Sequence, residues 1–419
     1  MLQTPDQGEN MKLKTLTAVL AASLSVAQAE KLTIWMVGDD NNGTRIMQAA
    51  ADLFQTKNKD VTFEIRNIPW SDAYTKYLAA IASKSGPDII TGGLSFGISL
   101  GKQGGLVNIG KEYPAFAAQV KKVAQKGVMK SITSLDGSLY AVPYNLDVQL
   151  MYYRKDTLKD MKISLPKNWD QLTKANDKLK AAGKKPFMQQ WGNANWLGFF
   201  PFFYQAGGEF YDDKCSKSTI NSTEGVQALK YYAELYTKYK APTDGWPDIE
   251  AALDSGDAAL TSTGPWTLAS IDASRPKLQG KWGIAKMPAG PSGKSTAFIG
   301  GSTIMVMSYS KNKDLAMKYL QHLYTTSAAR AMINASTKLG SLWIPARTDL
   351  ASLLNLPADR KSALIAQLKD AEGPSNCPGW EESGDAVTQA IQQVIFSGQD
   401  PKAALDAAAK VMDRNLAKR

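Results

Sequence analysis

Histidine and cysteine are almost absent from this sequence. Its 419 residues include one histidine, His322, and two cysteines, Cys215 and Cys377. Two cysteines without histidine partners cannot complete the four ligands of a structural zinc site, and a lone imidazole argues against histidine-based catalysis. We therefore expect no metal ion, no cofactor and no catalytic set built around histidine.

Long apolar runs and dense basic tracts are also missing. Hydrophobic residues make up 44% of the chain and charged residues 21%, which excludes a disordered chain and a polytopic membrane protein. The formal charge is +10, but the basic residues occur singly or in pairs such as Lys121-Lys122, so we expect no nucleic-acid partner. A length of 419 residues predicts two domains.

The N-terminus has the pattern of a secretory signal peptide. From Met11 the chain has two lysines, a short apolar stretch (16–26) and the small-residue end Ala27-Gln28-Ala29. This pattern predicts a signal peptide over 11–29, cleaved after Ala29, and an exported, soluble protein. A buried helix is the alternative interpretation. Residues 1–10 carry no Lys or Arg, so a start at Met11 and a start at Met1 both remain open.

Export would place the two cysteines in an oxidising compartment, where a disulfide can form. Their spacing says nothing about the distance between them in the folded chain. The sequence therefore leaves open whether Cys215 and Cys377 are joined.

Beyond the signal peptide, strand and helix patterns alternate. Hydrophobic periodicity predicts three strands and two helices, over 32–37, 46–54, 61–65, 71–81 and 87–90. Ser71 is a candidate cap for the second helix. Strand, helix, strand, helix, strand is typical of a parallel sheet covered by helices, so the predicted fold class is α/β.

Ligands of parallel sheets bind in the loops that follow the carboxyl ends of the strands. Two such loops, 39–42 and 92–95, consist mainly of small and polar residues, which suits a groove for a polar ligand. Ordinary turn formation explains either loop equally well, because Asp, Asn and Gly are also the usual turn residues.

The sequence is rich in tryptophan, with ten in all. Trp196 ends the polar segment 191–196, Trp266 follows Gly264-Pro265, and Trp380 precedes two glutamates. Aromatic faces stack on the C–H faces of sugar rings while Asp, Asn and Glu bond the hydroxyls, so these segments fit a carbohydrate cleft. Many tryptophans are simply core residues, and we expect the aromatic run 199–204 to be core as well.

Three motifs of catalysis or nucleotide binding fail. Gly293-Lys294-Ser295 resembles the end of a phosphate loop, but Pro288 stands where the first glycine belongs. The segment 93–97 matches G-x-S-x-G, but its histidine could only be His322, which falls inside a predicted helix. Acidic pairs such as Glu381-Glu382 could serve a glycosidase, but the sequence cannot place two carboxyls across one bond.

As a whole, the chain resembles the extracellular sugar-binding proteins of ABC importers, the group typified by maltose-binding protein. Each matching segment is weak alone, but the ordered set is specific and covers nearly all of residues 31–396. The segments are Leu32–Trp35, Gly86–Ile90, Gly137–Tyr144, Met151–Asp156, Asn168–Leu172, Ala206–Gly208, Gly256–Leu260, Gly264–Trp266 and Phe298–Gly301.

The resemblance implies a two-lobe periplasmic-binding-protein fold of type II, with hinge strands and a cleft between the lobes. The N-terminal lobe would comprise 30–146 and 304–350, and the C-terminal lobe 147–303 and 351–419. The implied function is capture of a sugar in the periplasm and its delivery to the permease subunits of an ABC transporter. The supply of aromatics favours a di- or oligosaccharide, and the resemblance implies a monomer that is not an enzyme.

Carried over residue by residue, the resemblance also predicts the ligand contacts. They are Asp39, Asn41, Gly93, Ser95, Asp147, Asn193, Trp196, Trp266, Gly301 and Trp380. The loop 92–94 lacks the large polar or aromatic group that maltose-binding protein has there, and Asn195 could replace Asn193. These departures leave the identity of the sugar undetermined.

Two alternatives remain at this point. The same fold could bind a non-sugar solute: a polyamine, for which acids such as Asp147 and Glu381 are available, or glycerol phosphate. The candidate loops lack the converging Arg or Lys that a phosphate requires. The other alternative is a secreted carbohydrate-active enzyme, although no catalytic set stands out. Turnover of an oligosaccharide would separate that enzyme from a binder.

Overall fold

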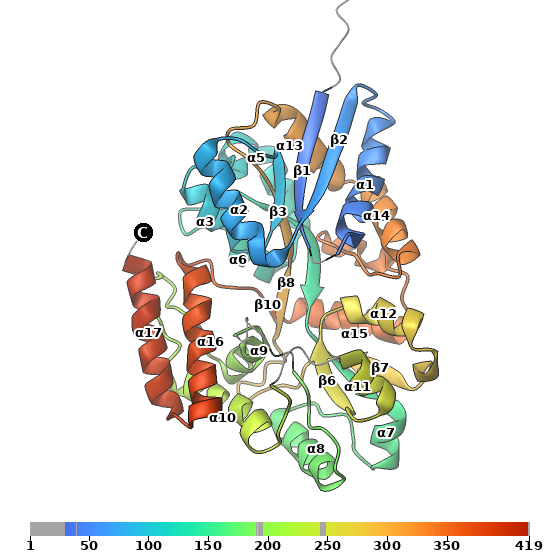
Figure 1. Cartoon of the computed structure of the whole chain (residues 1–419), viewed down its shortest axis with the longest axis vertical. Helices are drawn as coiled ribbons and strands as arrows, with labels where there is room; N and C mark the ends of the chain where they lie inside the picture. The colour runs from blue at the N-terminus through green and yellow to red at the C-terminus, as the bar shows by residue number, and fades with distance from the viewer. Residues whose placement is uncertain (1–29, 39, 190, 192–195, 244–248, 418–419) are drawn as a thin grey trace, which may run out of the picture.

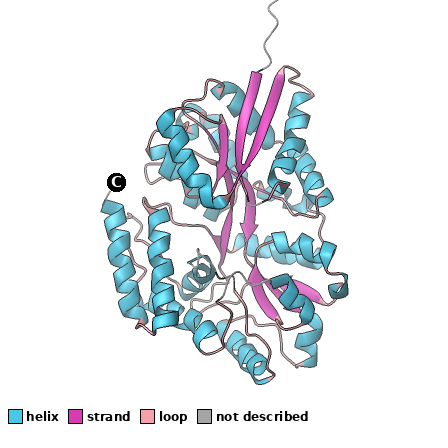
Figure 2. Ribbon diagram, in the orientation of Figure 1, coloured by secondary structure: helices cyan, strands magenta, loops and turns pink. Residues whose placement is uncertain are grey.

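The computed structural model describes residues 30–417 except 39, 190, 192–195 and 244–248. The predicted signal peptide and two predicted contacts, Asp39 and Asn193, lie outside the described residues. The chain forms two lobes, one above the other in Figure 1, and each lobe has its own sheet with helices around it (Figure 2). The predicted two-lobe α/β fold is confirmed. We call the upper one the large-sheet lobe and the lower one the small-sheet lobe.

Seven strands form the sheet of the large-sheet lobe. They are β1 (Glu30–Val37), β2 (Val61–Ile68), β3 (Ile89–Gly92), β4 (Val142–Val148), β8 (Ala297–Val306), β9 (Ile344–Pro345) and β10 (Ala371–Glu372). Their order is β2-β1-β3-β8-β4-β9, and β10 pairs with β8. β1 runs parallel to β2 and β3, as the alternating pattern predicted, whereas β8 runs antiparallel to β3 and β4.

Helices cover both faces of this sheet (Figure 1). They are α1 (Asn42–Gln55), α2 (Trp70–Ser83), α3 (Phe96–Lys102), α4 (Ile109–Glu112), α5 (Pro114–Val123), α6 (Lys126–Ile132), α13 (Lys313–Leu323) and α14 (Thr326–Lys338), with the 3₁₀ helix η2 (Thr348–Leu353). The predicted cap of α2 is wrong: Pro69 is the N-cap residue, and the Ser71 hydroxyl bonds Asp72 at 3.0 Å instead.

The small-sheet lobe is built on three antiparallel strands in the order β6-β5-β7: β5 (Leu150–Arg154), β6 (Leu260–Thr263) and β7 (Trp282–Ala285). Its helices are α7 (Lys155–Asp160), α8 (Trp169–Ala181), α9 (Trp196–Ala206), α10 (Thr223–Thr237), α11 (Ile249–Ser255), α12 (Trp266–Ser274), η1 (Pro276–Leu278), α15 (Ala358–Lys369), α16 (Trp380–Ser397) and α17 (Pro401–Ala417). The aromatic run 199–204 in α9 is buried, as predicted. Among the described helices, none is long and apolar enough to cross a membrane.

The hinge lies where β4 and β8 pass between the lobes. β4 leads into β5 through one residue, and β8 returns beside it, with Asp147 opposite Gly300. Gly301 has a φ of +108°, and a Cβ at this position would lie 2.2 Å from the carbonyl oxygen of Asn145. Only glycine fits this backbone conformation and this close approach, so the hinge itself requires Gly301.

The segment 371–379 runs along the junction and is bonded to both lobes. Asn376 Nδ2 donates a hydrogen bond to the carbonyl oxygen of Thr133 in the large-sheet lobe, at 2.9 Å. Cys377 forms a disulfide with Cys215 of the small-sheet lobe, with the two Cα atoms 5.5 Å apart. The disulfide that the sequence left open therefore fixes this segment to the small-sheet lobe.

Candidate ligand-binding cleft

The carboxyl ends of β1, β2 and β3 lie at the edge of the large sheet that faces the other lobe (Figure 1). Asn41 follows β1 as the N-cap residue of α1; its side chain is exposed and makes no capping hydrogen bond. Its neighbour Asp40 accepts hydrogen bonds from the backbone and side-chain nitrogens of Asn42, at 2.8 and 2.9 Å. The Asn41 amide is therefore available at the ligand-binding edge of the sheet.

The loop after β3 contacts the opposite lobe directly. The Ser95 hydroxyl donates a hydrogen bond to the carboxylate of Glu381, the second residue of α16. These two residues, together with Ser99 and Trp380, line a hollow between the lobes. Gly93 is half-buried two residues before Ser95. The structure thus places both predicted residues of this loop at the junction.

Asp147 is a half-buried carboxylate at the hinge. Burial raises the pKa of Asp147 to about 6, because the ionised form loses part of its hydration. Among the described residues, none forms a hydrogen bond or ion pair with this side chain. A carboxylate without a protein partner is suited to accept hydrogen bonds from hydroxyl groups of a ligand.

Trp196 and Trp380 meet at the junction side of the small-sheet lobe. Their ring centroids are 5.5 Å apart in an edge-to-face arrangement, and Trp196 also meets Phe298 of β8 at 5.7 Å. Trp196 is half-buried, but Trp380 is only 4% exposed and packs on Phe210, with ring centroids 4.9 Å apart. Of these two predicted contacts, Trp380 is buried and packs against Trp196, whereas Trp196 lies nearer the surface of the lobe.

Trp266 has the opposite environment. It begins α12 after Gly264 and Pro265, which follow the end of β6, and 44% of its surface is exposed. Its ring folds over Gly264, where an added Cβ would lie 1.9 Å from the ring, and the Gly264 carbonyl accepts a hydrogen bond from Tyr152 at 2.7 Å. The backbone beneath the indole is therefore fixed, while part of the ring faces solvent.

Two residues at the junction were not among the predicted contacts. Glu381 contacts Ser95, and Trp70, 41% exposed, begins α2 at the end of β2. The rule that ligands bind beyond the carboxyl ends of parallel strands was applied to the loops after the first and third strands. Applied to the second strand as well, it would have found Trp70.

The structure gives no support to the nucleophile motif. Ser95 bonds Glu381, whereas His322 lies on α13 with its Nε2 atom 3.1 Å from the carbonyl oxygen of Ala50. Burial lowers the pKa of His322, as expected for a packed helix histidine. Within the described ranges, no cluster of three or more His, Cys, Asp or Glu side chains could hold a metal ion.

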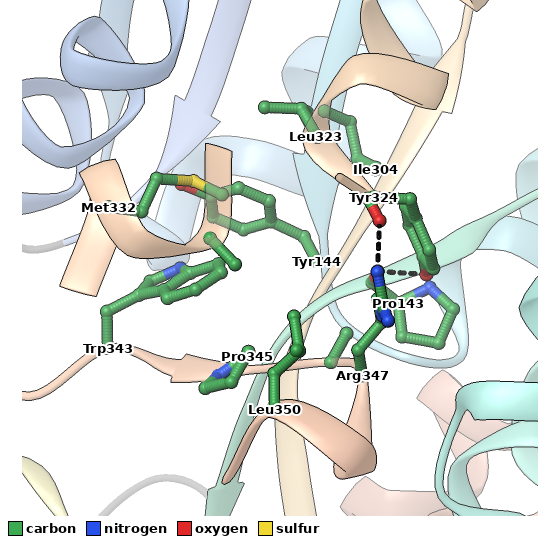
Figure 3. A pocket seen from close by; sticks show the side chains of 12 residues that line it. Pro143, Tyr144, Ile304, Leu323, Tyr324, Met332, Trp343, Pro345, Arg347 and Leu350 are labelled. Carbon is green, nitrogen blue, oxygen red and sulfur yellow. Dashed lines mark hydrogen bonds between the residues drawn. The ribbon is translucent and has the colours of Figure 1, made fainter. Parts of the chain in front are cut away.

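A separate, mainly apolar pocket lies inside the large-sheet lobe (Figure 3). The rings of Tyr144 and Trp343 meet in it edge to face, with centroids 5.6 Å apart. Tyr324 donates its hydroxyl to the carbonyl of Pro143 and accepts a 2.8 Å hydrogen bond from Arg347 on its own carbonyl. This lining lacks the carboxylates and amides that a sugar requires, so Trp343 belongs to the interior of this lobe.

Comparison with known proteins agrees with this architecture. A lactose-binding protein of Rhizobium radiobacter is 29% identical to the chain over 338 residues, which cover 76% of this chain and 77% of the relative. A galactooligosaccharide-binding protein of Bacillus subtilis is 24% identical, covering 93% of this chain and 90% of the relative.

Solved structures show the same fold. The sugar-binding protein MalE of Xanthomonas citri aligns with a TM-score of 0.79 at 22% identity, covering 93% of this chain and 98% of that one. The family model described as bacterial extracellular solute-binding protein matches residues 40–330. Because this match takes in most of both lobes and the hinge between them, the chain belongs to the bacterial extracellular solute-binding proteins.

Proposed function

We propose that the protein captures a sugar between its lobes and delivers it to the permease subunits of an ABC transporter. The proposal is carried by the half-buried carboxylate of Asp147, which has no protein partner among the described residues, and is supported by the exposed indole of Trp266. Asp147 lies at the hinge, and Trp266 begins α12. The Asp147 carboxylate can accept hydrogen bonds from sugar hydroxyls, and the Trp266 ring offers an apolar face for sugar C–H groups.

The proposed ligand is a neutral di- or oligosaccharide. The relatives named for lactose and for galactooligosaccharides bind compounds of this class. A phosphorylated solute fits less well, because the described residues that line the hollow at Ser95 include no Arg or Lys. A polyamine would need several ionised carboxylates, and the carboxylate of Glu381 already accepts a hydrogen bond from Ser95.

We assign the ligand contacts to ten positions in the two lobes and the hinge. They are Asp39, Asn41, Gly93, Ser95, Asp147, Asn193, Trp196, Trp266, Gly301 and Trp380, with Gly301 acting through the hinge backbone and Trp380 through its packing on Trp196. In this proposal the lobes are 30–146 with 304–350, and 147–303 with 351–419. The ligand leaves the cleft chemically unchanged.

The proposed processing and location of the protein follow from its N-terminal sequence pattern. The chain starts at Met11 or Met1, loses its signal peptide after Ala29, and works in the periplasm as a monomer. Mass spectrometry of the exported protein tests this directly. A mature N-terminus at Glu30 is expected, and an intact N-terminal segment would overturn the assignment.

A thermal-shift screen of the exported protein tests the function. The probes are lactose, galactooligosaccharides, maltodextrins, glycerol phosphate and spermidine. A ligand at a hundred times its dissociation constant stabilises the fold by about 2.7 kcal/mol, which gives a clear shift. A shift with a neutral sugar, without release of products, supports the proposal. A shift only with spermidine or glycerol phosphate, or turnover of the sugar, would overturn it.

A further inference from the structure

One loop of the small-sheet lobe, 210–215, holds the start of α16. Three contacts join them: the rings of Phe210 and Trp380 with centroids 4.9 Å apart, the 2.7 Å hydrogen bond from the Tyr211 hydroxyl to that of Ser383, and the disulfide between Cys215 and Cys377. Cys377 lies three residues before Trp380, at which α16 begins. The position of the first turn of α16 therefore depends on this loop.

That first turn forms part of the junction between the lobes. Glu381 accepts the hydrogen bond from Ser95 of the large-sheet lobe, and Trp380 meets Trp196 with ring centroids 5.5 Å apart. Cys377 lines the same hollow as Ser95 and Glu381. Only two residues separate Cys377 from Trp380, so a shift of the Cys377 backbone would displace the first turn of α16 as well.

The two ends of the disulfide are held differently. Cys215 lies in a hairpin, 211–218, in which the carboxylate of Asp212 accepts backbone hydrogen bonds from two residues later in the turn, at 2.7 and 3.4 Å. The backbone N–H of Cys377 donates instead to the hydroxyl of the neighbouring Ser375, at 3.1 Å. The hairpin is therefore a fixed anchor, and breaking the S–S bond releases mainly the Cys377 side.

The disulfide also borders a second hollow. Cys215, which is half-buried, and Cys377 both line a polar hollow of about 140 Å³. Its walls include Lys130 of the large-sheet lobe and Glu209 of the small-sheet lobe, whose charged groups are 3.9 Å apart. This hollow gives a small dithiol a route to the bond, since disulfide reduction requires access to a sulfur atom.

We propose that the Cys215–Cys377 disulfide is a positioning element of the sugar site, which holds Trp380 and Glu381 in the arrangement that binds sugar. The affinity is then higher in the oxidised protein than in the reduced one. This inference rests on the proposed function and deepens it. Two of the three contacts of the loop 210–215 remain after reduction, so the loss of affinity is partial, about three- to tenfold. Because coupling between sites is reciprocal, bound sugar stabilises the disulfide by the same factor.

Titration calorimetry tests the effect on affinity, with lactose, galactooligosaccharides and maltotriose as probes. Dithiothreitol supplies the two electrons and two protons that convert the S–S bond into two thiols, and is itself oxidised to its cyclic disulfide. The reduced protein and the double variant Cys215→Ser, Cys377→Ser should both bind about three- to tenfold more weakly than the oxidised wild type. The chain has no other cysteine, so dithiothreitol should not change the affinity of the double variant.

Two further measurements separate positioning from general stabilisation of the fold. If the affinities differ tenfold, saturating sugar should lower the reduction potential of the disulfide by about 30 mV. Without sugar, reduction should speed hydrogen exchange in peptides covering 375–384 and leave α5 unchanged. The matched control is Val120→Ala, a fully buried position in α5, which should lower stability but bind like the wild type.

The outcomes distinguish this inference from the proposed function. Equal sugar affinity in the oxidised and reduced protein would overturn the positioning role and leave the function standing, whereas binding of none of the three sugars would overturn both. An equal loss of affinity in Val120→Ala would show that stability alone is responsible. Ser383→Ala keeps the disulfide but removes the Tyr211 contact, and it should also weaken binding. An unchanged affinity in this variant would count against the role of the loop even if the double variant does not fold.

Discussion

The hinge carboxylate Asp147 should make sugar affinity depend on pH. Its pKa is raised to about 6 by burial alone. A sugar hydroxyl donates a stronger hydrogen bond to an ionised carboxylate than to a neutral carboxyl group. Binding therefore favours the ionised form, and the affinity should fall as the pH drops through 6.

The size of this effect follows from the pKa. With a pKa of about 6, roughly nine-tenths of the free protein is ionised at about pH 7 and roughly one-tenth at about pH 5. If only the ionised form binds well, the affinity falls about tenfold over this range, which is about 1.4 kcal/mol. Asp147→Asn has no such titration, so its affinity should be lower than that of the wild type at neutral pH and nearly constant below it.

The stability of the free protein should change in the opposite direction. A folded-state pKa above the ordinary value of 3.8 means that the neutral form of Asp147 is preferred in the fold. The contribution of Asp147 to stability is then full below the unfolded pKa and is lost as the pH rises through 6. At neutral pH, Asp147→Asn should therefore melt higher than the wild type while binding sugar more weakly.

Calorimetry from pH 5 to 7.5 at constant ionic strength measures both consequences. In buffers of different ionisation enthalpy, the wild type should release protons on binding near pH 6, and Asp147→Asn should not. Burial lowers the pKa of His322, but this residue lies on α13 against Ala50 and is unchanged in the variant. Identical pH profiles for the wild type and Asp147→Asn would refute the reasoning.

Three further predictions concern the disulfide, the exposed indole and the hinge. The disulfide links residues 162 positions apart, so the double variant Cys215→Ser, Cys377→Ser should lose about 2–4 kcal/mol of unfolding free energy in urea titration; unchanged midpoints would contradict this. Trp266→Ala should weaken oligosaccharide binding about tenfold in calorimetry while leaving the melting temperature unchanged, since the ring is 44% exposed. Gly301→Ala should lower the melting temperature, because its Cβ would clash with Asn145 at a positive φ and cost at least about 1–3 kcal/mol. A wild-type melting curve would show that the hinge tolerates a side chain.

Local patterns were enough to predict much of the large-sheet lobe. The first three strands and the first two helices could be predicted because apolar residues repeat with periods of 2 and 3.6. The cap of α2 was wrong for a local reason, since Pro69 starts the helix without a side-chain hydrogen bond. The long-range pairing of β8 with β3 and β4 was not predicted, because the paired residues are more than 150 positions apart and local patterns carry no information about them.

The candidate site was harder to predict from the sequence than the fold. Trp380 and Trp266 look alike in sequence, each beginning a helix after a loop containing Gly and Pro. In the fold, Trp380 is covered by Phe210 and Trp196, whereas Trp266 keeps an open face. Trp70 was missed because its neighbours form an ordinary strand end.

The sequence by itself determined the α/β class, the export pattern, the aromatic core of α9 and the membership in a two-lobe family, because these depend on local periodicity and on the order of motifs along the chain. Only the tertiary structure decided which tryptophans remain exposed, that Ser95 reaches Glu381, and that Cys215 meets Cys377. Exposure and contact depend on which distant segments pack over a residue, and that information is absent from the spacing of residues along one chain.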